Sequence, residues 1–185
     1  MIAPTRPEPS VNEPTLYVAF ELGKKDWKLA MTSGVGVQPW LRTVAINGVM
    51  AGCRPEYMPV LVALIEAMAD PRYGVEHSGN TPGAETLIIV NGPIIRRLGF
   101  NYQQGALRDG FQANTSIGRF WRLYLRNVAG FLPHKTDKGT FGNTWRVVLA
   151  ENEDALARMG WTTIAQDQGL KPGDNAVTIS RFTGG

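Results

Sequence analysis

Residues 86–93 read TLIIVNGP, and this stretch decides the fold. The run from Thr86 to Val90 is short, apolar and rich in β-branched side chains, so it predicts a strand. An apolar run without alternation is typical of a strand that is buried on both faces. The strand is expected to end at Asn91, because Asn-Gly-Pro favours a turn. A strand of this kind needs cover on both sides, which predicts α/β layers.

Two longer segments supply the helices of these layers. Residues 54–69, RPEYMPVLVALIEAMA, are apolar almost all round and carry Pro55 in a favoured first-turn position, so they predict a buried helix. Residues 115–128 predict a second helix, capped by Asn114 or Thr115. Further segments predict strands at 144–150 and 175–182 and short helices at 94–98 and 154–159. The predicted fold class is therefore α/β, a layered sheet with two main helices.

The N-terminal part of the chain has a different character. Residues 1–14 contain four prolines and few apolar side chains, which predicts a disordered leader. Residues 15–20 and 27–32 predict the two strands of a β-hairpin, and residues 37–46 predict a third strand. We therefore predict a leader at 1–14, a β-hairpin extension at 15–43 and an α/β domain at 44–185.

Composition narrows the class of protein and of site. The chain has 185 residues, and none of its apolar runs reaches the length of a membrane span. No basic stretch followed by an apolar core opens the sequence, so we expect a cytoplasmic protein without a membrane partner. Cys53 is the only cysteine, which excludes an internal disulfide. The only histidines are His77 and His134, so we expect no metal.

Charge is distributed unevenly along the chain. Between residues 96 and 146 nine basic side chains stand against two acidic ones, although the net charge is only +3. Between residues 56 and 90 five acidic side chains stand against one basic one. This asymmetry is consistent with a site for a small anionic molecule or for nucleic acid, and equally with solvated faces that pair within the molecule.

Cys53 is the first candidate for chemistry. It lies in MAGCRPE, directly before the helix predicted at 54–69. Free backbone N–H groups at a helix start stabilise a thiolate, and the neighbouring Arg54 adds a positive charge and could contact substrate. The alternative is an inert thiol packed under the helix, because free cysteine is among the most buried residue types.

Three further segments carry candidate site residues. Asn91 and Gly92 follow a strand, where ligands gather in α/β sheets and where glycine permits a close approach, although a plain turn explains them too. Asn114, Thr115 and Arg119 at a helix start could bind an anion, or Asn114 and Thr115 could simply cap the helix. Residues 151–154, ENED, follow a strand and could bind a cation or transfer protons, or could form a solvated acidic loop. The common nucleotide-binding, hydrolase and zinc-protease motifs are absent from the sequence.

Residues 15–44, TLYVAFELGKKDWKLAMTSGVGVQPWLRTV, resemble the first strands of an insertion-sequence transposase with an RNase H-like (DEDD) catalytic domain. In this resemblance Glu21 stands near the first metal-binding acid, which is usually an aspartate. The other acids of such a site are missing, and one glutamate cannot build a two-metal centre. The resemblance implies a fused, transposase-derived fragment rather than transposition activity.

Residues 44–185 resemble the domain associated with the UGSC-motif family of thiol or selenol proteins. The resemblance is carried by VAINGVMAGCRPEYMPVLVALIEAM, LIIVNGPIIRRLGF, ANTSIGRFWRLYLRNVAG and the final ENED. It implies an α/β domain that works beside a cysteine- or selenocysteine-based redox centre. The UGSC segment itself is absent from this sequence, so the resemblance implies a partner subunit that carries it.

Together these patterns predict an enzyme subunit. We expect it to act on a small anionic substrate in thiol- or selenol-linked redox chemistry, as a thiol-dependent oxidoreductase-like component. In this hypothesis Cys53 is the catalytic thiol, and the substrate-binding residues are Arg54, Asn91, Gly92, Asn114, Thr115 and Arg119. The alternative is an inactive fusion, or a transposase-derived fragment with at most weak, salt-dependent DNA binding. The cofactor stays open.

Overall fold

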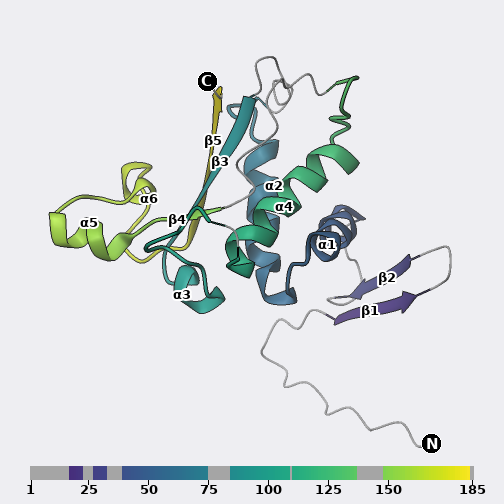
Figure 1. The fold of residues 1–185 in the computed structure, drawn as a ribbon, viewed down its shortest axis with the longest axis horizontal. Helices are drawn as coiled ribbons and strands as arrows, with labels where there is room; N and C mark the ends of the chain where they lie inside the picture. Colours follow the sequence, from purple (N-terminus) through teal and green to yellow (C-terminus); the bar gives the residue numbers. More distant parts are fainter. Residues whose placement is uncertain are drawn as a thin grey trace, which may run out of the picture. The chain divides into compact units, whose positions relative to one another are not determined.

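The computed structural model describes residues 17–22, 27–32, 39–74, 84–108, 110–136 and 148–183. The chain divides into two compact units, residues 1–42 and 43–185, and each is described by itself. Figure 1 shows the order of the elements along the chain. The predicted leader at 1–14 lies outside the described residues.

The first unit contains the predicted hairpin. Strand β1 (Tyr17–Leu22) pairs antiparallel with β2 (Trp27–Thr32), so that Tyr17 lies opposite Thr32. Both strands are rich in aromatic and aliphatic residues, as strands of such a pair commonly are. The prediction of a hairpin is confirmed.

The predicted third strand at 37–46 is wrong, because helix α1 spans Pro39–Ala51. Proline is well tolerated at a helix start, so Pro39 begins the helix instead of interrupting a strand. Val44, Asn47 and Ala51 are buried, at the spacing of one helix face. Gly48 lies on the same face, where an added Cβ would come within 2.8 Å of Leu61 Cδ1. The helical face, rather than an alternating one, is what this segment buries.

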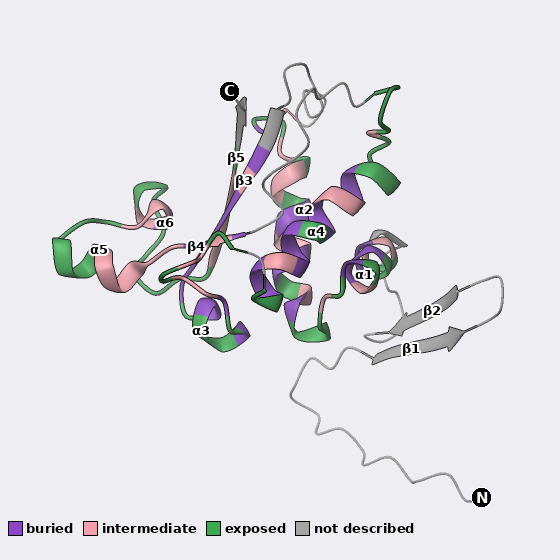
Figure 2. Cartoon of the chain, in the orientation of Figure 1, coloured by how far each residue is buried: buried purple, intermediate pink, exposed green. Residues whose placement is uncertain are grey.

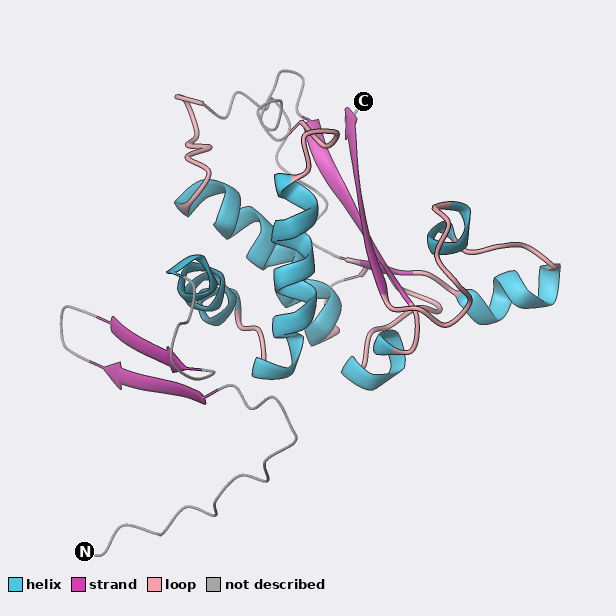
Figure 3. Ribbon diagram, turned by 180° about the vertical axis from the view of Figure 1, so that it is seen from behind, coloured by secondary structure: helices cyan, strands magenta, loops and turns pink. Residues whose placement is uncertain are grey.

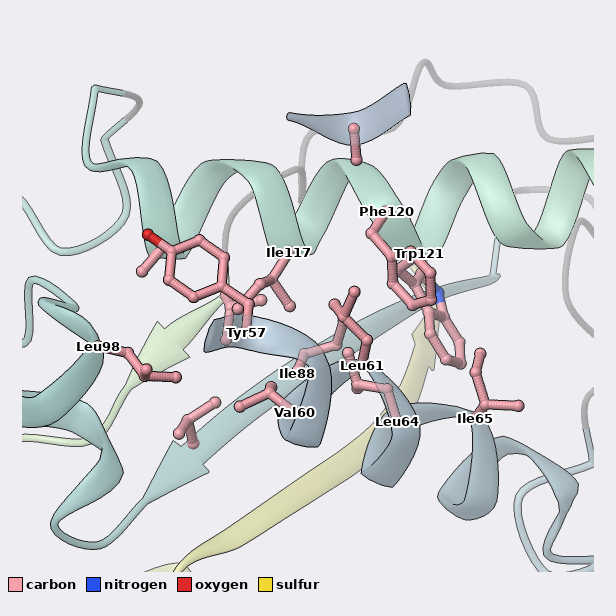
Figure 4. Packing of buried hydrophobic residues seen from close by; sticks show 14 of the residues in the cluster. Tyr57, Val60, Leu61, Leu64, Ile65, Ile88, Leu98, Ile117, Phe120 and Trp121 are labelled. Atoms are coloured by element: carbon pink, nitrogen blue, oxygen red, sulfur yellow. The ribbon is translucent and has the colours of Figure 1, made fainter. Parts of the chain in front are cut away.

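The predicted buried helix is confirmed in two parts. A short 3₁₀ helix η1 (Pro55–Tyr57) leads into α2 (Met58–Ala69), which ends before Pro71. Helix α4 (Gln112–Asn127) is the second main helix and packs on α2. Figure 4 shows Ile117, Phe120 and Trp121 of α4 meeting the side chains of α2. These two helices contribute more buried core residues than any other described helices.

The sheet has three strands in the order β4–β3–β5. The central strand β3 (Ala84–Asn91) contains the run TLIIV and pairs parallel with β4 (Leu149–Ala150) and antiparallel with β5 (Ala176–Thr183). Only the last two residues of the predicted strand 144–150 are a strand among the described residues, since 141–147 lie outside them. The fold is a small mixed sheet covered by helices, an α/β fold.

The sheet has helices on both sides, as its central strand required. Helices α2 and α4 cover one face, and Ile88 and Val90 join them in the core. Helix α5 (Glu153–Met159) and helix α6 (Ile164–Asp167) lie on the other side, and α6 packs on β5 (Figures 1 and 3). Ile89, whose side chain alternates with those of its neighbours, is also only 4% exposed. Figure 2 shows burial concentrated on β3 and its helices, while α5 has no buried residue.

The short helix α3 (Ile94–Leu98) follows β3 and ends at Gly99, as predicted. Gly99 adopts φ +72°, a left-handed conformation that favours glycine at a helix end. None of the described helices is long and apolar enough to cross a membrane.

Candidate functional site

The sheet topology brings two distant segments to one edge. Strands β3 and β4 are parallel, so both end at the same side of the sheet. Asn91 is the last residue of β3, and Glu151 follows β4, with its backbone N–H bonded to the Val90 carbonyl at 3.1 Å. Ligands in α/β proteins bind beyond the carboxyl ends of strands, so this edge is the natural place for a site.

The side-chain amide of Asn91 binds two carboxylates. Asn91 is only 1% exposed, and its Nδ2 donates to Glu151 Oε2 at 2.6 Å and to Glu153 Oε1 at 3.0 Å. Both acceptors are carboxylate oxygens, so the amide nitrogen must be the atom that faces them. The other amide atom, Oδ1, is buried and has no partner among the described residues. A buried acceptor left unpaired costs about 1–3 kcal/mol, so Asn91 holds these carboxylates at the expense of stability.

Each of the two carboxylates has one fixed oxygen and one free oxygen. Glu151 Oε2 also accepts from the Ile164 backbone N–H at 3.0 Å, and Glu153 Oε1 accepts from the Gly92 N–H at 2.8 Å. Their other oxygens have no hydrogen-bond partner, and neither carboxylate forms an ion pair within 4.0 Å in the described part of the chain, although Glu153 lies within electrostatic range of Arg96. The arrangement therefore presents two oriented acceptors that no cation contacts directly.

A third carboxylate is paired. Asp154 Oδ2 lies 2.6 Å from a terminal nitrogen of Arg96 and accepts from the Tyr102 hydroxyl at 3.3 Å. The Arg96 guanidinium stands over the Tyr102 ring, 5.2 Å from its centroid. These contacts join α3 to α5, and Asp154 raises the pKa of Arg96 further. Arg96 is thus fixed in orientation on two sides while it stays accessible to solvent.

A cleft of about 240 Å³ lies between these groups. Its walls combine the charged side chains with apolar and glycine residues: Gly92, Pro93, Ile95, Arg96, Tyr102, Glu151, Glu153, Asp154 and Gly173. The described residues contain no group of three or more acidic, histidine or cysteine side chains arranged to hold a metal ion.

Gly92 was predicted to give a ligand access to the backbone, and the structure gives it a second role. It adopts φ +93°, and a Cβ there would lie 2.8 Å from the Asn175 Cα and closer still to the Asp174 carbonyl. The close approach is therefore made by the protein's own 174–175 segment. Asn175 Oδ1 in turn accepts from the Ile94 N–H at 2.8 Å and so caps α3. Gly92 still lines the cleft.

Cys53 does not line the cleft, and its side chain is half-buried. It packs against the hydrophobic cluster, and burial raises the pKa of its thiol to about 11, against a weaker opposing hydrogen bond with Ser116. This environment disfavours the stabilised thiolate expected from the sequence, because desolvation outweighs any gain at the helix start. The alternative of a packed, inert thiol describes this environment.

Arg54 does not face the Cys53 thiol. Its guanidinium donates to the Tyr57 hydroxyl at 2.7 and 2.9 Å and to the Leu98 carbonyl at 3.5 Å, and it stands 5.0 Å from the Tyr57 ring centroid. Tyr57 is fully buried, so Arg54 satisfies a hydroxyl that would otherwise lack a partner in the core. This is a structural role.

Asn114 and Thr115 are not N-cap residues, because α4 begins at Gln112. Asn114 is fully buried: its Oδ1 accepts from the Asn101 N–H at 2.9 Å, and its Nδ2 donates to the carbonyls of Asn101 at 3.0 Å and Val148 at 2.8 Å. All its hydrogen-bonding atoms are used, which leaves none for an anion. Thr115 donates to the Phe111 carbonyl, within its own helix.

Arg119 lies exposed on α4, and no hydrogen bond or ion pair joins it to the cleft in the described part of the chain. Of the two histidines, His134 is exposed and His77 lies outside the described residues. The predicted site residues therefore separate. Gly92 lines the cleft, and Asn91 lies behind it and holds two of its carboxylates. The cleft lining does not include Cys53, Arg54, Asn114, Thr115 or Arg119.

The sequence pointed to residues 151–154 as a candidate site or a solvated acidic loop, and the structure places Glu151, Glu153 and Asp154 at the cleft. Arg96 and Tyr102, which also line the cleft, were not predicted as site residues. One sequence feature could have indicated this cleft: polar residues follow two predicted strands, at Asn91 and at Glu151. If these strands were assumed to pair in parallel, Asn91 and Glu151 would be expected at the same edge of the sheet.

Comparison with known proteins adds no family to this description. No family model, curated protein or solved structure matches the chain. The function therefore has to be argued from the cleft itself.

Proposed function

We propose that the α/β domain is a ligand-binding subunit that takes a small molecule carrying an ammonium group into the cleft between α3 and α5. One observation carries this proposal. Glu151 and Glu153 are held by a single buried amide and by backbone N–H groups, and each keeps one oxygen free. Two oriented carboxylate oxygens are the natural partners of an ammonium group, which has three donors.

The sign of the charge separates this ligand from a purely anionic one. The lining has three carboxylates and one guanidinium, and that guanidinium is already paired with Asp154. A lone anion would meet the two unpaired carboxylates, whereas a cation would offset their repulsion. We therefore propose an ammonium-bearing ligand in place of the simple anion expected from the sequence.

The same geometry bears on the chemistry. A carboxylate with a fixed oxygen and a free oxygen can act as a general base toward an acidic group of a bound ligand. The lining contains no thiol, and Cys53 packs half-buried against the core, outside that lining. If the UGSC resemblance holds, the thiol or selenol comes from a partner subunit, and this chain supplies substrate binding.

The test is a binding experiment on the full chain. Ethylamine and propionate, which share an ethyl group and differ in charge, are titrated separately while the Gly92 amide resonance is followed by NMR. Ethylamine should shift this resonance in a saturable way, since the Gly92 N–H donates to Glu153. Propionate should leave it unchanged.

Charge-neutral variants locate the binding. Glu153→Gln and Glu151→Gln should each weaken ethylamine binding by about tenfold, the usual size for loss of one charge-assisted hydrogen bond. Glu66→Gln is the matched control, because Glu66 is exposed on α2 and away from the cleft lining. Equal losses in all three variants, or no saturable shift in the wild type, would overturn the proposal.

A further inference from the structure

The Arg96 guanidinium is held in an orientation that suits the binding of an anionic group. Its guanidinium is anchored at one nitrogen by Asp154 and lies against the Tyr102 ring, and the side chain is still 65% exposed. Anchoring and stacking fix the plane of the fork, so its remaining N–H donors keep one direction. A fixed fork with free donors is suited to bind a carboxylate.

The same cleft presents the opposite charge on its other wall. Glu151 and Glu153 offer their free oxygens there, and Glu153 acts electrostatically on Arg96, so the two walls are within range of each other. The buried Asn91 holds both carboxylates in place, although its own Oδ1 goes without a partner. This wall therefore carries two carboxylates of fixed orientation in the same cleft as Arg96.

We infer that the ligand is a zwitterion of amino-acid size, whose ammonium group binds the free oxygens of Glu151 and Glu153 and whose carboxylate binds the free donors of Arg96. This inference deepens the proposed function and rests on it. A cleft of about 240 Å³ has room for a small amino acid. Pro93 and Ile95 supply an apolar stretch of wall for the side chain of such a ligand.

The experiment uses three probes that share a two-carbon unit and differ in the charged groups attached to it. Alanine carries both charges, ethylamine carries only the ammonium group, and propionate carries only the carboxylate. Each is titrated into the full chain, and the Gly92 amide and the Arg96 side-chain Nε–H are followed by NMR. Alanine should bind at least about tenfold more tightly than ethylamine, because it gains the charge-assisted contact with Arg96.

Variants on α3 separate the two charges. Arg96→Gln should reduce alanine affinity to that of ethylamine and leave ethylamine affinity unchanged. Arg96→Lys should recover only part of it, because lysine keeps the charge but not the planar fork. Arg97→Gln is the control, since Arg97 is exposed on the same helix and does not line the cleft.

The outcomes distinguish this inference from the function beneath it. If ethylamine binds and alanine binds no more tightly, the zwitterion is overturned while the proposed function stands. If Arg97→Gln lowers alanine affinity as much as Arg96→Gln, the assigned role of Arg96 is overturned. If neither ethylamine nor alanine binds, the proposed function fails and the inference fails with it.

Discussion

Replacing Asn114 by alanine tests whether this residue binds a ligand, as one interpretation of the sequence proposed, or holds the fold together, as its hydrogen bonds indicate. The substitution removes three hydrogen bonds at once, which tie helix α4 to the backbone of Asn101 and Val148. It removes no atom that lines the cleft. A structural role predicts loss of stability with ligand binding intact, whereas a binding role predicts the reverse.

The magnitude follows from these contacts. Each net hydrogen bond contributes about 1 kcal/mol, so three contribute about 3 kcal/mol to the free energy of unfolding. The Val148 carbonyl belongs to a residue that is fully buried, and leaving it without a donor raises the loss toward about 5 kcal/mol. Asn101 is only partly buried, so water can replace some of what it loses.

Urea denaturation followed by tryptophan fluorescence measures this loss. Trp121, which is 2% exposed on the same helix, moves into water on unfolding. Thr115→Ala is the matched control, because its hydroxyl bonds only within the helix and is accessible to solvent. That control should cost less than about 1 kcal/mol.

A loss below about 1 kcal/mol for Asn114→Ala, combined with weaker ligand binding, would refute this reasoning. It would show that the buried hydrogen bonds of Asn114 contribute little and that its amide serves a ligand. Equal losses for Asn114→Ala and Thr115→Ala would count against the structural assignment as well, because the two side chains differ so strongly in burial.

Three other predictions concern Cys53 and Gly92. Alkylation of Cys53 should proceed with an apparent pKa of about 11, with Cys53→Ser as the blank, and at pH 8 it should be about 100-fold slower than for an unperturbed thiol; a pKa below 9 would contradict burial. Folding raises the pKa of the Cys53 thiol, so the neutral thiol stabilises the folded state fully below pH 9, and this contribution is lost as the pH rises through 11. The free energy of unfolding of the wild type should therefore fall more over this pH range than that of Cys53→Ala. Gly92→Ala should lower the free energy of unfolding by more than about 3 kcal/mol, because it adds a backbone clash to a left-handed conformation. Gly160→Ala is the control: Gly160 has φ +72° and open space around it, so the loss should be only about 1 kcal/mol. Thermal unfolding compares the two variants, and similar losses would refute the clash.

Local sequence patterns correctly predicted those helices and strands whose own residues are apolar enough to indicate burial. The run TLIIV predicted a strand covered on both faces, and the apolar segment 54–69 predicted a buried helix; both are confirmed. The segment 37–46 was misread, because Pro39 and a few apolar residues fit either an interrupted strand or a helix start. Only packing of Val44 and Ala51 into the core decides between them.

The start of α4 shows a similar limit. Asn114 and Thr115 are good capping residues by type, so the sequence placed the helix start there. The structure extends the helix back to Gln112 and uses the Asn114 amide to satisfy three backbone groups. Those groups belong to residues 13 and 34 positions away, so no local signal could reveal them.

What the sequence by itself determined is the class of the fold and one wall of the candidate site. Strand and helix propensities depend on near neighbours, and the turn at Asn91 and Gly92 is recorded in consecutive residues. Tertiary structure alone decided that Asn91 meets Glu151 and Glu153, sixty residues further on, and that Arg96 stands at the same cleft. The physical reason is the parallel pairing of β3 with β4, which brings their carboxyl ends together. Tertiary packing also covers part of Cys53 and raises the pKa of its thiol, because desolvation outweighs the stabilisation that a helix start offers a thiolate.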